Sequence, residues 1–212
     1  MEQSLSFLEV LNTALENMTW IEIWAVITGL IYVILAAKEN IWCWFFGIIS
    51  SVLSIYLFYT GKLYAESILY GYYIVAGFYG WYIWSKRNVA NKEYLDQQKP
   101  ATLQIHSWTG KEHILAIGAG VLLSFPLGLL LKQYTDAQIP VLDAFTTIFS
   151  FIATYMVTRK VLENWLYWIV IDIVTTGMYF YKAYYLYALL MIIYTGIAIV
   201  GYMHWQRIQK GR

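Results

Sequence analysis

Residues 163–205 read ENWLYWIVIDIVTTGMYFYKAYYLYALLMIIYTGIAIVGYMHW, which is two long apolar runs joined by the short turn Lys-Ala-Tyr at 182–184. Each run has roughly the 20 residues that a helix needs to cross a hydrocarbon core about 30 Å thick. The stretch therefore predicts two antiparallel membrane-spanning helices, the first of which carries Asp172 in its interior.

The rest of the chain continues this pattern. Hydrophobic residues make up 60% of the 212 residues and charged residues only 13%, whereas soluble domains carry about 25% charged residues. The sequence therefore predicts an all-α membrane protein with seven transmembrane helices. The seven apolar runs cover residues 20–37, 41–59, 63–84, 113–131, 141–158, 164–181 and 184–205.

Basic residues are distributed unevenly between the two ends of these spans. With the N-terminus outside, the outer connections hold three Lys or Arg residues and the inner ones hold eleven. Since positive charge favours the cytoplasmic side, we predict an outer N-terminus and a cytoplasmic C-terminus. Residues 1–19 contain no Lys or Arg, which argues against a cleaved signal. Residues 4–18 are expected to form an outer amphipathic surface helix, with a frayed terminus as the alternative. Residues 85–112 are expected to be a cytoplasmic linker, and residues 207–212 a cytoplasmic tail.

The chain also resembles itself. The hexapeptide ENIWCW at 39–44 matches ENWLYW at 163–168, an offset of 124 that also aligns Gly77 with Gly201. Chance similarity between aromatic-rich helices is the alternative, but the matches run through two successive helices in the same order. Asn40, Gly77, Asn164 and Gly201 are the expected structural residues of this repeat.

The repeat divides the seven predicted helices into two groups and a connector. Residues 20–84 and 141–206 are the expected three-helix repeats, and residues 113–131 the connector helix. Because three helices reverse the direction of the chain and the connector restores it, the two repeats are expected to be parallel. Transporters use such parallel repeats, with the substrate bound where the repeats meet. The prediction is a 3-1-3 arrangement, in which one connector helix joins two three-helix repeats.

Ionisable residues inside the predicted spans need a function or a partner, because lipid solvates charge poorly. Asp172 lies about two turns into its helix, and its structural alternative is an ion pair with Lys182 or Lys160. Glu66 lies about one turn from the outer side and could instead be solvated by water. Both lie on helical faces rich in aromatic residues. The expected substrate-binding residues are Trp44, Glu66, Tyr70, Tyr73, Trp165, Trp168, Asp172 and Tyr194.

Aromatic rings with an acid would suit a small organic cation, since ring faces attract positive charge. The chain has no GxxxxGK[ST] motif, so a primary pump acting alone is excluded, and a net charge of +1 argues against a nucleic-acid partner. No metal site and no cofactor are expected, because the three His residues have no metal-ligand spacing. A membrane-embedded enzyme or a scaffold remains as a remote alternative.

The segments 58–84 (FYTGKLYAESILYGYYIVAGFYGWYIW) and 163–205 resemble the PnuC family of bacterial vitamin transporters. The resemblance rests on Leu-Tyr-Ala, Tyr-Gly-Trp-Tyr-x-Trp and Glu-Asn-Trp-x-x-Trp, and it covers the chain from about Trp20 to Trp205. It implies a SWEET-like seven-helix fold, often trimeric, in the bacterial inner (cytoplasmic) membrane. It also implies facilitated diffusion of a vitamin, which a cytoplasmic kinase then traps by phosphorylation.

The chain departs from the nicotinamide riboside pattern of that family, Leu-Tyr-Ala-Asp-x-x-Leu-Gln. Glu66 stands at the Asp position and Tyr70 at the Gln position. A Gln suits a carboxamide, whereas a Tyr offers a ring face and one hydroxyl. The resemblance therefore implies nicotinamide riboside, the commoner substrate, with thiamine close behind and riboflavin third.

Overall fold

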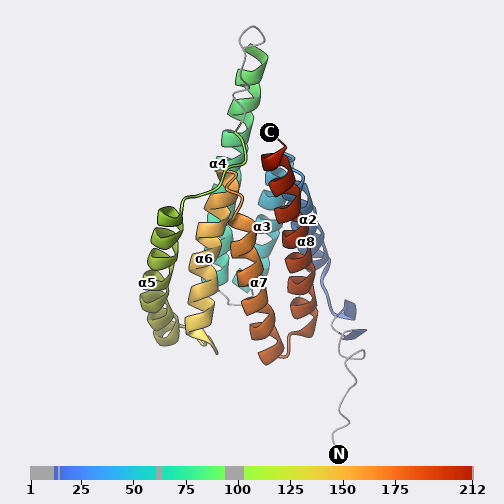
Figure 1. Cartoon of the computed structure of the whole chain (residues 1–212). Coiled ribbons are helices and arrows are strands. Elements are labelled where there is room, and N and C mark those ends of the chain that lie inside the picture. The colour runs from blue at the N-terminus through green and yellow to red at the C-terminus, as the bar shows by residue number, and fades with distance from the viewer. Residues whose placement is uncertain (1–11, 14, 61–63, 94–102, 212) are drawn as a thin grey trace, which may run out of the picture.

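The structure is a computed structural model that describes residues 12–13, 15–60, 64–93 and 103–211. The described part contains seven long helices that run side by side (Figure 1). The expected N-terminal surface helix lies mostly outside the described residues. The helices are α2 Trp20–Ala37, α3 Cys43–Thr60, α4 Tyr64–Glu93, α5 Gly110–Tyr134, α6 Pro140–Thr158, α7 Asn164–Tyr181 and α8 Tyr185–Lys210.

These seven helices coincide with the seven predicted runs, with longer ends where the sequence turns polar. The largest difference is in α4, which continues to Glu93 although its apolar run ends at Trp84. Residues 85–93 of the predicted linker are therefore helical. A helix does not need lipid to continue, because its backbone hydrogen bonds are internal and the residues after Trp84 include good helix formers.

Five of the seven helices, α2, α3, α5, α6 and α8, are long and apolar enough to cross a membrane. The hydropathy of α4 and α7 falls short of that of the other five. The same two helices carry Glu66 and Asp172, together with many Tyr and Trp residues, so their lower hydropathy reflects polar groups that face the bundle. An all-helical, multi-pass membrane protein is thus confirmed.

Successive helices pack against one another from α2 to α4 and from α5 to α8, and two further contacts join α2 to α8 and α4 to α6. Helix α5 lies at the edge of the bundle beside α6 (Figure 1). Helices α2, α4, α6 and α8 all end at the same side, which we call the C-terminal end of the bundle.

Local sequence explains several helix ends. Thr19 and Thr109 each begin a Thr-x-x-Glu capping box, which satisfies the free backbone N–H groups at the starts of α2 and α5. Helix α6 begins with Pro140, whose missing N–H costs nothing in the first turn.

The turns after α2 and α6 have the same unusual geometry. Glu39 and Lys160 have φ angles of 54° and 56°, in the left-handed region that usually favours glycine. Asn40 N–H donates to the Leu35 carbonyl and Val161 N–H to the Met156 carbonyl, as in a Schellman turn. Each helix thus ends with a charged side chain at a position where glycine would be less strained.

In the predicted groups α2–α4 and α6–α8, helix starts and turns recur at an interval of 121 residues, whereas the sequence match has an interval of 124. Helices α3 and α7 begin 121 residues apart, at 43 and 164, as do α4 and α8, at 64 and 185. Glu39 and Lys160 are also 121 residues apart. The two intervals differ by three residues, close to one helical turn, and such a shift leaves aromatic residues on the same face. At an interval of 121 residues, Gly201 aligns with Gly80 rather than with Gly77.

Both of these glycines lie against a tryptophan. A Cβ at Gly201 would lie 2.9 Å from Trp165, and one at Gly80 would overlap the Trp44 ring. We expect Gly80→Ala and Gly201→Ala each to lower the free energy of unfolding by about 1–3 kcal/mol through overpacking. Thermal unfolding in detergent would measure this. Gly196→Ala is the control, because its Cβ would meet no atom within 4 Å; equal losses in all three variants would contradict the packing explanation.

Candidate functional site

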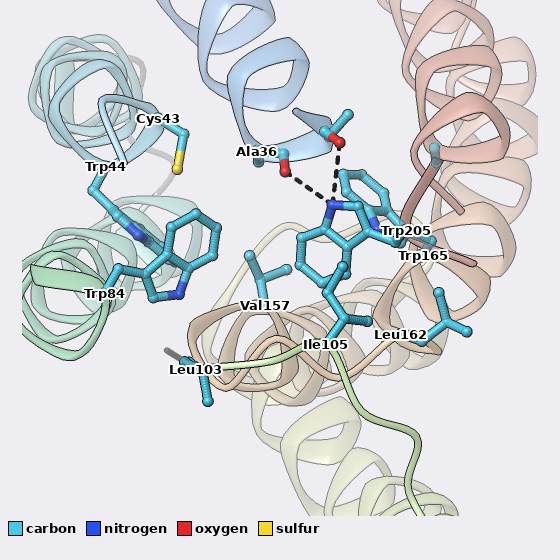
Figure 2. Close-up of a cluster of buried hydrophobic side chains, with 12 residues drawn as sticks. Ala36, Cys43, Trp44, Trp84, Leu103, Ile105, Val157, Leu162, Trp165 and Trp205 are labelled. Atoms are coloured by element: carbon cyan, nitrogen blue, oxygen red, sulfur yellow. Dashed lines mark hydrogen bonds between the residues drawn. The ribbon is translucent and has the colours of Figure 1, made fainter. Parts of the chain in front are cut away.

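A buried cluster of aromatic and aliphatic side chains closes the C-terminal end of the bundle, and we call it the tryptophan cluster. Trp44 meets Trp84 edge to face, with ring centroids 5.3 Å apart, and Trp165 meets Trp205 in the same way at 5.4 Å. Figure 2 shows the two pairs on opposite sides of Val157. The cluster comprises Ala36, Ala37, Cys43, Trp44, Trp84, Leu103, Ile105, Val157, Leu162, Trp165, Ala198 and Trp205.

Two of these indoles donate hydrogen bonds between α2–α4 and α6–α8, one in each direction. The Trp205 Nε1–H on α8 donates to the carbonyls of Ala36 and Ala37 at the end of α2, at 3.2 and 3.1 Å (Figure 2). The Trp84 Nε1–H on α4 donates to the Thr158 carbonyl at the end of α6, at 3.1 Å. Each bond satisfies a carbonyl that the end of a helix leaves without an intrahelical partner.

The structure places two of the predicted site residues, Trp44 and Trp165, in this cluster. Each side chain is only 2% exposed, which leaves little surface for a ligand. Their indole N–H groups have no hydrogen-bond partner among the described residues. Packing of α3 against α4 and of α7 against α8 accounts for their positions.

A second group of aromatic side chains lies inside the bundle, and we call it the tyrosine cluster: Tyr70 and Tyr73 of α4, Tyr179 of α7 and Tyr194 of α8. The Tyr70 and Tyr73 ring centroids are 5.2 Å apart, and both Tyr179 and Tyr194 lie near Tyr70. All four side chains are half-buried. The cluster therefore brings tyrosine hydroxyl groups and ring edges together between α4, α7 and α8.

Two of these tyrosines lie near buried serines of other helices. The Tyr70 hydroxyl lies near Ser54 of α3, and the Tyr73 hydroxyl lies near Ser150 of α6. Since Ser54 and Ser150 are themselves buried, the tyrosine hydroxyl groups face small polar side chains between the helices.

Asp172 adjoins this cluster. Its side chain is 6% exposed and interacts electrostatically with Tyr194. Neither lysine that the sequence suggested as its structural partner is available. Lys160 Nζ lies 3.1 Å from Glu39 Oε1, and Lys182 Nζ lies 3.3 Å from Asp143 Oδ1. Within the part of the chain that the structure describes, Asp172 forms no ion pair.

Glu66 lies in the first turn of α4, half-buried, and interacts electrostatically with Tyr70 and Tyr179. It therefore faces the same cluster as Asp172. Trp168, one turn before Asp172, is half-buried between the tryptophan cluster and a smaller core around Phe149. Five of the eight predicted site residues thus lie in the tyrosine cluster or beside it, Trp168 lies one turn from Asp172, and Trp44 and Trp165 lie in the tryptophan cluster.

The predicted structural residues have different roles. Asn40 Oδ1 accepts a hydrogen bond from the Trp42 N–H in the turn after α2. Asn164 is fully buried, and its Nδ2 donates to the Val161 carbonyl at 2.6 Å. Gly77 lies against Ile48, where a Cβ would approach to 2.7 Å, and Gly201 lies against Trp165. These residues set turns and close helix contacts, although Asn40 and Asn164 are not equivalent.

Sequence reasoning missed Tyr32 as a neighbour of the site. Its ring centroid lies 6.1 Å from that of Trp44, and its hydroxyl interacts electrostatically with Tyr194. Gly29, on the same face of α2, allows the Tyr194 hydroxyl to approach, because a Cβ there would lie 2.8 Å from it. The helical spacing of the small or polar residues Ala25, Thr28, Gly29 and Ala36 around Tyr32 could have identified this face.

The surface of the bundle has two hollows, and both lie away from the tyrosine cluster. One, of about 490 Å³, is open and lies beside Trp108, Tyr155 and Arg159, and another, of about 240 Å³, is apolar and lies beside Trp20 and Trp24. Neither is lined by a predicted site residue. Ionisable groups inside membrane spans indicate a functional site better than an open surface hollow does, so the tyrosine cluster with Glu66 and Asp172 is the candidate site.

Comparison with known proteins agrees with this description. The chain is 29% identical to the nicotinamide riboside transporter PnuC of Escherichia coli, over 89% of this chain and 86% of that protein. It is 23% identical to the riboflavin/roseoflavin transporter RibM of Streptomyces davaonensis, over 90% and 86%. The crystal structure of the vitamin B3 transporter PnuC has the same fold, with a TM-score of 0.74 over 96% of this chain and 90% of that one, at 24% identity.

The sequence profile of a whole family also matches, and it extends over nearly all of the helical bundle. The family is described as nicotinamide mononucleotide transporter, and the match runs from residue 19 to residue 207. The chain therefore belongs to this family of membrane transporters, as its resemblance to PnuC predicted.

Proposed function

We propose that this protein carries nicotinamide riboside across the membrane by facilitated diffusion, and that a cytoplasmic kinase traps the vitamin. The observation that carries the proposal is Asp172, a buried carboxylate that the described residues leave without a cationic partner, beside Tyr194. A buried carboxylate is costly unless it has a counterion, and the pyridinium ring of nicotinamide riboside would supply one. The names of the PnuC relatives support the same substrate.

The proposed binding residues are those in or beside the tyrosine cluster. Tyr70, Tyr73 and Tyr194 would provide ring faces and hydroxyl groups, and Asp172 and Glu66 would provide countercharge. Trp168 would close the site toward the tryptophan cluster. Trp44 and Trp165 are assigned to packing instead, because only 2% of each is exposed.

Thiamine is the second candidate, and Tyr70 favours it. Thiamine carries a cationic thiazolium, and a tyrosine suits a cationic ring better than it suits a carboxamide. We expect Tyr70→Gln to raise the affinity for nicotinamide riboside severalfold relative to thiamine, because the amide can exchange two hydrogen bonds with the carboxamide. Quenching of tryptophan fluorescence on titration with each vitamin would measure the ratio. An unchanged ratio would contradict a position beside the carboxamide.

The proposed architecture is a 3-1-3 carrier whose parallel three-helix repeats, α2–α4 and α6–α8, are joined by α5. The common offset of 121 residues and the reciprocal bonds of Trp84 and Trp205 support it. In this proposal the two repeats rock about the site, so that it opens to each side in turn.

We also propose a homotrimer in the bacterial inner membrane, with the N-terminus outside and the C-terminus in the cytoplasm. The orientation rests on the positions of the basic residues: Lys38, Arg159 and Arg207 all lie at the C-terminal end of the bundle. Reporter fusions at both termini would test the orientation, and native mass spectrometry would test the trimer.

Transport by purified protein in liposomes is the decisive test of function. We expect concentration-driven uptake of nicotinamide riboside or thiamine that a protonophore does not abolish, with riboflavin as the neutral comparison. Kinase enclosed in the liposomes should increase the amount accumulated without changing the initial rate. Absence of flux for all three vitamins would overturn the proposal.

A further inference from the structure

Glu39 and Lys160 form an ion pair between corresponding positions of the two helix groups. The two residues are 121 positions apart, the offset that relates the groups, and Lys160 Nζ lies 3.1 Å from Glu39 Oε1. Corresponding residues can touch only near the axis that relates the two groups. One group carries an acid there and the other a base, so one contact joins the groups directly.

The backbone conformation at both residues favours glycine, so the turn itself does not explain why each position has a charged side chain. Each occupies the left-handed position after its helix, where glycine would be less strained. A third turn of this kind, after α7, has a neutral residue, Ala183, at the same position. The geometry of the turn therefore does not itself require a charged side chain.

Further contacts surround the pair at the C-terminal end. The Lys160 ammonium lies 4.5 Å from the centre of a Trp84 ring, a cation–π contact between α4 and the turn after α6. Both charged side chains are mostly buried, with 14% and 15% of their surface exposed. The pair is therefore protected from solvent, and its loss would leave a charge in poorly hydrated surroundings.

A segment of the linker covers the same region. Leu103 and Ile105 are buried in the tryptophan cluster. The His106 N–H donates to the Lys160 carbonyl at 3.2 Å, and the Leu162 N–H donates to the His106 carbonyl at 2.8 Å. The backbone of the Lys160 turn is thus held from the linker side as well.

We infer that the Glu39–Lys160 pair is the inner gate of the carrier, closed in this structure and broken whenever the site opens to the cytoplasm. This inference rests on the proposed transport function. Glu39 follows α2 and Lys160 follows α6, so the two belong to different moving halves. A path from the tyrosine cluster to the C-terminal end needs those halves to separate there, which breaks the bond between Lys160 Nζ and Glu39 Oε1.

The single cysteine of the chain provides a direct test. Cys43 is fully buried in the tryptophan cluster and interacts electrostatically with Lys160. Opening the gate would expose its thiol. We expect a maleimide to label wild-type protein in nanodiscs slowly, and to label Glu39→Gln and Lys160→Gln about tenfold faster, because neutralising one partner favours the open state.

Two variants distinguish the effect of losing the ion pair from a general loss of folded structure. Lys160→Arg keeps the charge at the same turn, and the exchange Glu39→Lys with Lys160→Glu restores the pair in reverse; both should label nearly as slowly as wild type. Lys182→Gln is the matched control, because it removes a pair of similar burial, with Asp143, at the opposite end and should leave labelling unchanged. Wild-type rates in the two neutral variants, or fast labelling in the charge-retaining ones, would overturn the inference.

This measurement does not depend on the vitamin. If the charge variants label as expected and no vitamin crosses the membrane, the pair still controls access to Cys43 at this end of the bundle, but the transport proposal fails. If vitamins are transported while the rate of Cys43 labelling does not depend on the charges at positions 39 and 160, transport stands and the assignment of the gate to this pair is wrong.

Discussion

Asp172→Asn is expected to reduce the uptake of a cationic vitamin about a hundredfold, because the neutral amide no longer offsets the positive charge of a desolvated substrate. The substitution keeps the size and most of the hydrogen-bonding capacity of the side chain. Since neither Lys160 nor Lys182 is bound to Asp172, the loss would not come from a broken structural ion pair. Initial rates of nicotinamide riboside and thiamine uptake into liposomes would measure it.

The charge of the substrate provides an internal control for this prediction. Riboflavin has a neutral ring system, so any uptake of riboflavin should change much less than uptake of the cationic vitamins. Asp136→Asn, at an exposed acid in the connection after α5, should leave all rates unchanged. Wild-type uptake of nicotinamide riboside by Asp172→Asn at equal protein level would show that Asp172 is not the counterion.

The sequence predicted the helices well because each membrane span repeats one simple requirement, a run of apolar residues long enough to cross the lipid. The same reasoning located Asp172, since an acid in such a run stands out whatever surrounds it. It could not decide which lysine pairs with which acid. Lys160 and Lys182 were both reasonable partners for Asp172. The structure instead pairs Lys160 with Glu39, which follows α2, and Lys182 with Asp143 of α6.

The depth of the tryptophans shows a second limit of sequence reasoning. Trp44, Trp165 and Trp168 all lie on aromatic helical faces, so periodicity places them together. The structure separates them, because Trp44 and Trp165 pack tightly on Trp84 and Trp205 while Trp168 stays half-buried. Periodicity identifies the face of a helix, but it does not report how deep each residue lies along the bundle.

Trp205→Ala is expected to be the most destabilising single substitution at the C-terminal end, lowering the free energy of unfolding by about 3–5 kcal/mol. The Trp205 side chain is fully buried, packs edge to face on Trp165 and supplies hydrogen bonds to two carbonyls at the end of α2. Truncation would leave a large cavity and would also remove the indole donor from both carbonyls, of which that of Ala36 keeps the Glu39 N–H. Thermal unfolding in detergent, followed by tryptophan fluorescence, would measure the loss.

Trp205→Phe separates the two contributions, because a phenyl ring keeps much of the packing and removes only the donor. We expect it to cost about 1–3 kcal/mol, and Trp84→Phe to cost a similar amount, since the Trp84 indole donates to the corresponding helix end. Trp20→Ala, at a residue 78% exposed, should change stability in detergent little. A cost for Trp84→Phe near zero, beside a large cost for Trp205→Phe, would show that the two reciprocal bonds are not equivalent, and that the two halves of the bundle are held together mainly from the α8 side.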